Sequence, residues 1–228
     1  MIQPVLMDAF CCSGIAAEGY ARAGFDVLGI DIDPQPRYPF TFFQRDAMLW
    51  LADIPDYVDV VHASPPCQRY SDLAKRNGNA DDWPDLIPEV RELLDAWGGP
   101  YVIENVEGAP LDGITLCGTM FPGLRVLRHR VFESNVPLVQ PPHPRHPLVF
   151  THDKRKAHYG RLDQDTSFVQ VTGGGNCTMA NARSAMGLPA DDRRTKHELN
   201  EGIPAAYTEF IGYQLRAALL TNREAVAA

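Results

Sequence analysis

The feature that most constrains the fold is a series of short apolar segments, each of strand length and each ending in polar residues, proline or glycine. These segments span residues 4–10, 25–33, 57–64 and 100–106. Apolar side chains recur at helical spacing over residues 15–23 and 85–97, and a further helical pattern opens at Pro204. Strands that alternate with helices across short turns predict an α/β fold with a doubly wound, mostly parallel sheet.

Sheets of this kind bind ligands at the carboxyl ends of their strands, and this chain has its polar residues at those ends. The four strand ends are residues 8–14, 31–33, 64–68 and 104–106. In the third, SPPCQ, Pro65 and Pro66 end the strand and hold Cys67 at its tip. We therefore expect Cys67 to face a cofactor-binding cleft.

Cys67 is the exception among five cysteines, of which the others are Cys11, Cys12, Cys117 and Cys177. The number is odd, and no CxxC or Cys/His spacing is typical of zinc. We expect free, mostly buried thiols in a reducing compartment and no metal site.

Length and composition are those of an ordinary globular protein. The 228 residues suffice for one α/β domain with a small appendage, and 45% of them are hydrophobic and 22% charged. No apolar run approaches the length of a membrane span, and the N-terminus MIQPVLMDAF lacks an export signal. We expect a cytoplasmic protein, with a monomer favoured.

The charge is acidic overall but basic in one stretch. A formal net charge of −8 and a pI near 5.3 argue against indiscriminate binding to nucleic acid. Residues 125–161, however, contain eight arginines and lysines and five histidines against only Glu133 and Asp153. This stretch is either solvated surface or a place where a polyanion docks.

A change in amino-acid composition near residue 135 predicts a domain boundary, because the proline-rich stretch VPLVQPPHPRHPLVF begins there. We predict a catalytic domain of residues 1–134 plus 196–228. Residues 135–195, which include the glycine run TGGGN, form a small, loop-rich module in this prediction.

In their order along the chain, the strand-end segments resemble the motifs of the cytosine-C5 DNA methyltransferase family, of the small bacterial or phage type. The matching segments are DAFCCSGIAAEGYARAGF (8–25), GIDIDP (29–34), SPPCQ (64–68), ENV (104–106), LRHRVF (127–132) and EGIPAAYTEFIG (201–212). The resemblance covers most of the chain outside residues 135–195. It implies a Rossmann-like methyltransferase domain, with residues 135–195 as the target-recognition module.

The resemblance also implies covalent catalysis, which the chemistry of these residues supports. Cytosine C5 is too weak a nucleophile to take a methyl group from a sulfonium, but a thiolate that adds at C6 makes the ring enamine-like. Cys67 would be this nucleophile, and Glu104, with a pKa raised by burial, would protonate or hydrogen-bond N3. Arg128 and Arg130, predicted to share a strand face, would contact the base and the catalytic loop. Gln68 completes the expected catalytic set.

The implied methyl donor is S-adenosylmethionine. The residues expected to bind it are Asp8, Phe10, Cys11, Ser13, Gly14, Ile15, Asp31, Ile32, Asp46, Pro65 and Glu201. Asp31 is placed for the ribose hydroxyls, and Asp46 resembles the residue that reads the adenine amino group. Cys12 and Ile15 stand where the family has glycines, which predicts a tighter donor turn, and Glu201 stands where it has asparagine.

The implied substrate is double-stranded DNA, from which the target cytosine is flipped into the cleft. Residues 68–82 have the length and composition of the loop that closes over it, and residues 172–178 are predicted to lie nearest the bases. A cognate restriction endonuclease is a further candidate partner. The small module predicts a short or relaxed target site, or help from a partner chain.

Three other functions stay open. A tRNA cytosine-C5 methyltransferase of the same fold would carry its own cysteine signature, which is not evident around Cys177. A non-catalytic DNA-binding relative typically lacks the nucleophile or the carboxylate, whereas Cys67 and Glu104 are both present. An NAD-dependent oxidoreductase would have GxGxxG after the first strand, where this chain has CCSGIA.

Overall fold

The computed structural model describes residues 3–146, 168–172 and 177–227. Seven strands in this part of the chain form one mixed sheet in the order β3-β2-β1-β4-β5-β7-β6. The strands are β1 (Val5–Ala9), β2 (Asp26–Asp31), β3 (Thr41–Gln44), β4 (Val60–Ala63), β5 (Tyr101–Asn105), β6 (Ile114–Leu116) and β7 (Arg130–Ser134). Strands β1 to β5 pair in parallel, while β7 runs antiparallel to both β5 and β6. The predicted doubly wound, mostly parallel sheet is therefore confirmed.

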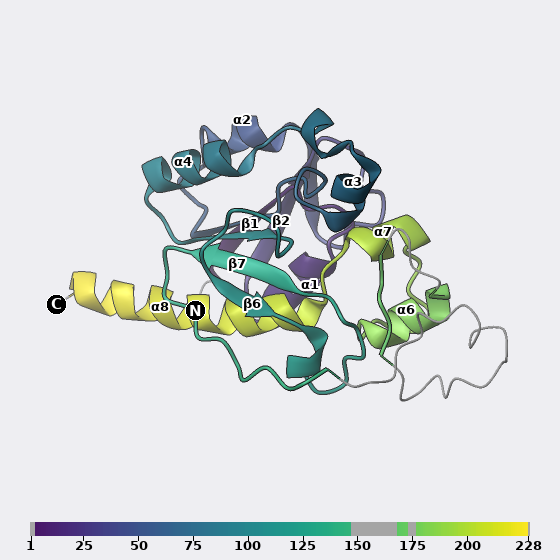
Figure 1. Cartoon of the computed structure of the whole chain (residues 1–228). Coiled ribbons are helices and arrows are strands. Elements are labelled where there is room, and N and C mark those ends of the chain that lie inside the picture. The colour runs from purple at the N-terminus through teal and green to yellow at the C-terminus, as the bar shows by residue number, and fades with distance from the viewer. Residues whose placement is uncertain (1–2, 147–167, 173–176, 228) are drawn as a thin grey trace, which may run out of the picture.

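Helices cover both faces of this sheet, with α2 and α4 on one side and α1 and α8 on the other (Figure 1). The helices are α1 (Ile15–Arg22), α2 (Ala47–Leu51), α3 (Asp72–Asn77), α4 (Ile87–Trp97), α6 (Met179–Ala185), α7 (Lys196–Glu201) and α8 (Ala205–Ala227), with 3₁₀ turns η1 (Ala80–Asp82) and η2 (Gly118–Met120). In the part of the chain that the structure describes, no helix is long and apolar enough to cross a bilayer.

Neighbouring residues on the central strands point into different cores, because side chains alternate between the two faces of a strand. Leu6 and Val60 pack on the side of α1 and α8. Met7 and Val61, the next residues in each strand, pack beneath α2 and α4. Since both faces are buried, the carboxyl ends of the strands are where polar side chains of the sheet gather.

The four predicted strands and the main predicted helices are present, but the strand predicted to contain both arginines is shorter. Residues 125–127 pair with Val169 instead of the main sheet, and β7 begins only at Arg130. Arg128 therefore precedes the strand, and the expectation that Arg128 and Arg130 share a strand face is wrong.

The described parts of the predicted module pack against the predicted catalytic domain. Val169, Ala185 and Leu188 share a buried cluster with Ile15 of α1 and Leu199 of α7. The division of the chain at residues 135 and 195 stays a prediction. Several features of that prediction lie outside the described residues, namely Lys154, Arg155, Lys156, Arg161, most of the glycine run and most of the loop expected nearest the bases.

Candidate active site

A narrow cleft lies at the carboxyl ends of β1, β4 and β5 and has a water-accessible volume of about 40 Å³. Eight of its lining residues belong to the predicted sites: Asp8, Phe10, Cys11, Ser13, Gly14, Ile15, Glu104 and Glu201. The structure thus brings together segments that are far apart in the sequence, at the place where the strand-end pattern predicts a ligand.

The turn after β1 is held in an unusual backbone conformation. Phe10 and Cys12 have positive φ angles of 58° and 45°, and Gly14 has φ 77°. The Cys12 amide donates a 2.9 Å hydrogen bond to the carboxylate of Asp31, which fixes the turn to the end of β2. A left-handed conformation costs a residue with a Cβ about 1–2 kcal/mol, which is a physical reason for the family to have glycine at position 12. A side chain at Gly14 would also meet Tyr38 and Pro39 at 2.7–2.9 Å.

Ile15, the second departure from the family pattern, is accommodated by a glycine across the cleft. Its side chain is buried at the start of α1, and a Cβ on Gly202 would lie 2.4 Å from its Cδ1. The larger residue in the donor turn therefore depends on a glycine after α7. Glu201, beside this glycine, lines the cleft, and its carboxylate lies 3.2 Å from Nε2 of His197. Burial raises the pKa of Glu201, and the nearby carboxylates of Asp31 and Asp33 add to the rise.

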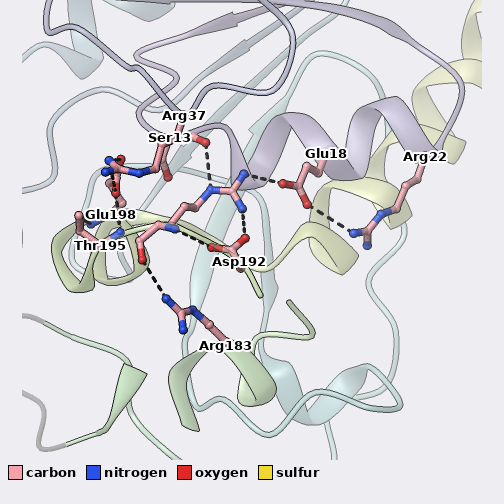
Figure 2. A network of polar contacts seen from close by, with 9 residues as sticks. Ser13, Glu18, Arg22, Arg37, Arg183, Asp192, Thr195 and Glu198 are labelled. Carbon is pink, nitrogen blue, oxygen red and sulfur yellow. Dashed lines mark hydrogen bonds and ion pairs between the residues drawn. The ribbon is translucent and has the colours of Figure 1, made fainter. Parts of the chain in front are cut away.

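A buried arginine that has no place in the predicted motifs supports the donor turn from behind. Figure 2 shows Ser13, Glu18 and Asp192 around one guanidinium group, which the hydrogen bonds identify as that of Arg194. It donates to the backbone carbonyl of Ser13 at 3.1 Å, to Asp192 at 2.6 Å and to Glu18. The guanidinium is only 5% exposed, so these contacts are shielded from water. A lone arginine in a loop carries no sequence signal by which this role could be predicted.

The turn that presents Cys67 is tied to the next strand. Asn105, at the end of β5, donates a 2.8 Å hydrogen bond to the carbonyl of Pro65, which fixes the local backbone. The Cys67 carbonyl accepts from the amides of Tyr70 and Ser71, which closes the turn. Burial raises the pKa of the Cys67 thiol, while the positive charges of Arg130 and Arg128 act in the opposite direction.

Glu104 is a buried carboxylate with one unused oxygen. Its Oε1 lies 3.0 Å from Nε of Arg130, but the two are not aligned as a hydrogen bond, so this oxygen has no hydrogen-bond partner. The side chain of Ser64 hydrogen-bonds to the carboxylate. Burial raises the pKa of Glu104 against the opposing effects of Arg130, Ser64 and Arg128. Apart from its ion pair with Arg130, Glu104 Oε1 can still accept a hydrogen bond from a ligand.

Behind Glu104 a chain of buried polar groups extends into the core. Ser64 Oγ lies 2.8 Å from Nε2 of His62, and Nδ1 of the same ring lies 2.9 Å from the hydroxyl of Tyr20. His62 and Tyr20 are fully buried, and burial lowers the pKa of His62 to about 3. A neutral imidazole therefore orients the serine that hydrogen-bonds to Glu104.

Arg128, just before β7, is joined to the C-terminal end of α7 and to the segment before α6. Its guanidinium is buried and donates to the backbone carbonyls of Val171, Asn200 and Glu201. The carbonyl of Arg128 in turn accepts a 2.8 Å hydrogen bond from the Tyr207 hydroxyl of α8. These contacts make Arg128 a backbone anchor of the cleft wall.

Eight predicted residues lie outside the lining of the narrow cleft: Asp31, Ile32, Asp46, Pro65, Cys67, Gln68, Arg128 and Arg130. Ile32, beyond the end of β2, is 67% exposed, whereas Pro65 is buried in the cysteine turn. Asp46 caps α2 by accepting from the amide of Met48 at 2.9 Å. Gln68 has a buried Oε1 without a hydrogen-bond partner.

The segment predicted as a closing loop, residues 68–82, contains the short α3 and η1. An open hollow of about 370 Å³ lies over it, lined by Arg69, Tyr70, Lys75, Gly78, Ala80 and Asp81. Basic side chains therefore stand on the segment that follows Cys67.

Comparison with known proteins gives a family match and two similar folds. Residues 8–110 match the family model described as C-5 cytosine-specific DNA methylase. No curated protein sequence matches the chain significantly. The Entamoeba histolytica methyltransferase EhMeth aligns with 96% of this chain and 99% of its own at 12% identity, with a TM-score of 0.55. The S. pombe Dnmt2 methyltransferase aligns with 95% of this chain and 99% of its own at 11% identity, also with a TM-score of 0.55. Because the identity is so low, these two matches show only that the structures share the fold of this chain.

Proposed function

Because the chain belongs, through residues 8–110, to the C-5 cytosine-specific DNA methylase family, we propose that it methylates C5 of a flipped cytosine in double-stranded DNA, with S-adenosylmethionine as donor. The observation that carries this proposal is the buried Glu104 oxygen without a hydrogen-bond partner, whose carboxylate lies close enough to Cys67 to act on the pKa of its thiol. An acid and a thiol held together at strand ends suit covalent catalysis on a pyrimidine.

The cleft fits the donor in chemical character. Ser13 has a buried hydroxyl without a hydrogen-bond partner, and Gly14 leaves the backbone of the turn free of any side chain. The carboxyl groups of Asp8 and Glu201 line the same cleft, and burial raises the pKa of both, that of Asp8 to about 8. A bound sulfonium would favour their ionised forms. S-adenosylmethionine supplies an electrophilic methyl group on a sulfonium. Ser13, Gly14 and Asp31 would hold it, and the exposed Ile32 would cover its adenine.

In the proposed reaction, the Cys67 thiolate forms a bond to C6 of the cytosine ring. Glu104 donates a proton or a strong hydrogen bond to N3, because its raised pKa favours the protonated form. Electron density then reaches C5, which takes the methyl group as its bond to the sulfonium sulfur breaks, and S-adenosylhomocysteine is the leaving group. Loss of the C5 proton to a base breaks the bond between sulfur and C6 and returns the thiolate.

Arg130 is the residue proposed to bind the carbonyl of the cytosine. Its Nε lies 3.0 Å from Glu104 Oε1, so the base edge that meets the carboxylate can also reach the guanidinium. Arg128, whose guanidinium already donates to three backbone carbonyls, would hold the cleft wall rather than the base.

The cleft must widen for both ligands, since its volume of about 40 Å³ is far below the several hundred Å³ typical of small-molecule sites. The 68–82 segment would move as the base enters, and Arg69 and Lys75 on its hollow would contact phosphates. Double-stranded DNA is proposed as the substrate because the matching family model is described as a DNA methylase and the cysteine signature of the tRNA-acting branch is not evident around Cys177. Like the target site, a restriction partner stays a prediction from the sequence.

A methyl-transfer assay tests the proposal. The purified chain is incubated with labelled S-adenosylmethionine and either duplex DNA or tRNA. We expect label in the DNA and none after Cys67→Ser, whose thermal midpoint should match that of the wild type. Label in tRNA alone would replace DNA as the substrate, and unchanged transfer by Cys67→Ser would remove Cys67 from the mechanism.

A trapping experiment tests the covalent step separately. DNA that carries 5-fluorocytosine should form a stable adduct, because fluorine at C5 blocks the final elimination. Cys67→Ser should form none. Glu104→Gln should slow methyl transfer far more than it weakens DNA binding, and equal losses in both would make Glu104 a structural residue.

A further inference from the structure

Four potential metal ligands converge at the sheet edge formed by β6 and β7. Cys117 directly follows β6, and His129 directly precedes β7. His143 and His146 come from the proline-rich sequence PPHPRH. One sulfur and three ring nitrogens from these residues all lie within 4.8 Å of one another. The group runs from the fully buried Cys117 to the exposed His143.

The spacing of these atoms is close to that of a tetrahedral zinc site. Cys117 Sγ lies 3.6 Å from Nε2 of His146, and Nε2 of His129 lies 3.2 Å from Nε2 of His143. With zinc–sulfur bonds of about 2.3 Å and zinc–nitrogen bonds of about 2.0–2.1 Å, a tetrahedral site has sulfur–nitrogen distances of about 3.6 Å and nitrogen–nitrogen distances of about 3.4 Å. The two distances given above are close to these values. The largest distance between any two of the four ligand atoms is at most 4.8 Å and would shorten by about 1 Å on zinc binding.

The ring nitrogens face one another in a way that a shared cation explains. The rings of His129 and His143 are stacked at 13°, and the His146 ring lies 4.9 Å from His129 and 5.0 Å from His143. Two neutral imidazoles that present Nε2 to each other can form one hydrogen bond only if they are different tautomers. A cation lets every one of these nitrogens use its lone pair.

A carboxylate stands on the far nitrogen of one of these rings. His129 Nδ1 lies 3.5 Å from a carboxylate oxygen of Glu107, while its Nε2 faces the cluster. A carboxylate at the second ring nitrogen is the usual support of a metal-bound histidine, because it fixes the tautomer and the ring orientation. Glu107 therefore provides a second observation, independent of the four converging atoms.

We propose that Cys117, His129, His143 and His146 bind one Zn²⁺ ion in a four-coordinate, structural site. A thiolate with three imidazoles is a donor set that zinc accepts, and four protein ligands leave no open position for catalysis. This proposal is independent of the proposed methyltransferase activity.

The ion would fasten one end of the segment of residues 135–146 to the sheet. The middle of this segment is already attached, since the Thr115 amide donates to Gln140 at 2.8 Å and the Val139 amide donates to Gln214 at 2.7 Å. Zinc would also hold His129, the residue between Arg128 and Arg130. The site would thus connect the approach to the predicted recognition module with the arginines of the cleft.

Metal analysis of the purified full-length chain tests this proposal. We expect about one zinc per chain by mass spectrometry of the metal, and a blue cobalt derivative with a thiolate-to-metal absorption band. Cys117→Ser should lose the zinc and the thiolate band. His143→Ala, at an exposed position, should lower the zinc content without requiring the core to repack.

Matched controls are Cys177→Ser and His197→Ala, which change the same residue types outside the cluster and should retain full zinc content. A chelator should lower the thermal midpoint of the wild type by several degrees and leave that of His143→Ala unchanged. The proposal is overturned if the wild type carries no zinc, or if His143→Ala binds as much zinc as the wild type. Should Cys117→Ser fail to fold, His143→Ala alone decides between these outcomes.

Discussion

Replacing Tyr207 by phenylalanine should remove one buried hydrogen bond and little else. The Tyr207 side chain is fully buried, and its hydroxyl donates to the Arg128 carbonyl at 2.8 Å. The ring itself stacks on Phe121 at 5.1 Å and meets Phe132 edge-on at 6.4 Å, contacts that phenylalanine keeps. The change therefore isolates the hydroxyl from the packing of the ring.

The expected loss follows from the carbonyl that is left behind. A buried polar group deprived of its partner costs about 1–3 kcal/mol. In a chain of this size each kcal/mol corresponds to roughly 2–4 °C in the thermal midpoint, so we expect a fall of roughly 2–12 °C. Urea unfolding should give the same loss of free energy with an unchanged dependence on denaturant concentration.

Tyr213→Phe, on the same helix, is the matched control. Tyr213 is 56% exposed, and its hydroxyl makes only a 3.4 Å contact with Glu209. Its loss should change the free energy of unfolding by less than about 0.5 kcal/mol. If the two variants are equally stable, the hydrogen bond from α8 to Arg128 does not anchor the cleft wall.

Three further outcomes are expected. His62 has a pKa of about 3 in the folded chain, against 6.5 ordinarily, so between these two values it binds a proton only on unfolding. The free energy of unfolding should therefore fall as the pH drops below 6.5. Urea titrations of His62→Gln should show a weaker pH dependence. Gly202→Ala places a Cβ 2.4 Å from Ile15 Cδ1 and should lower the free energy of unfolding by about 1–3 kcal/mol. Adding Ile15→Val should restore part of this stability, because it removes Cδ1. If the losses of the two single variants simply add in the double variant, there is no clash between these residues. Ser64→Ala removes a hydrogen bond to Glu104 and should slow methyl transfer roughly 10- to 100-fold with little change in DNA affinity, as single-turnover rates would reveal.

The sheet and much of the cleft could be predicted from the sequence because their signals are local. Apolar strands that stop at polar residues are visible in a few consecutive letters, and the parallel sheet brings Ser13, Cys67 and Glu104 to one edge. The short β3 and β6 carry no such periodicity, so the sequence does not predict them, and the strand expected around Arg128 and Arg130 begins only at Arg130. Arg128 was misplaced because residues 125–127 pair with Val169, a contact 43 residues away that no local pattern indicates.

The contacts between distant parts of the chain were beyond sequence reasoning. Arg194 reaches Ser13 across 181 residues, and nothing near Arg194 distinguishes it from a surface arginine. The Cys117–His146 pair spans 29 residues with no CxxC motif, which led to the expectation of no metal site. Side-chain groups of this kind become visible only when the fold has brought them together.

The attachment of Arg194 to the donor turn has a practical consequence for chimeric enzymes. The guanidinium of Arg194, which supports Ser13, lies just before α7, at the end of the module predicted over residues 135–195. A graft that exchanges target preference between relatives should therefore cut before residue 177 and retain residues 177–195 of the recipient. A junction placed after Arg194 would exchange a support of the turn proposed to bind the methyl donor together with the predicted recognition module.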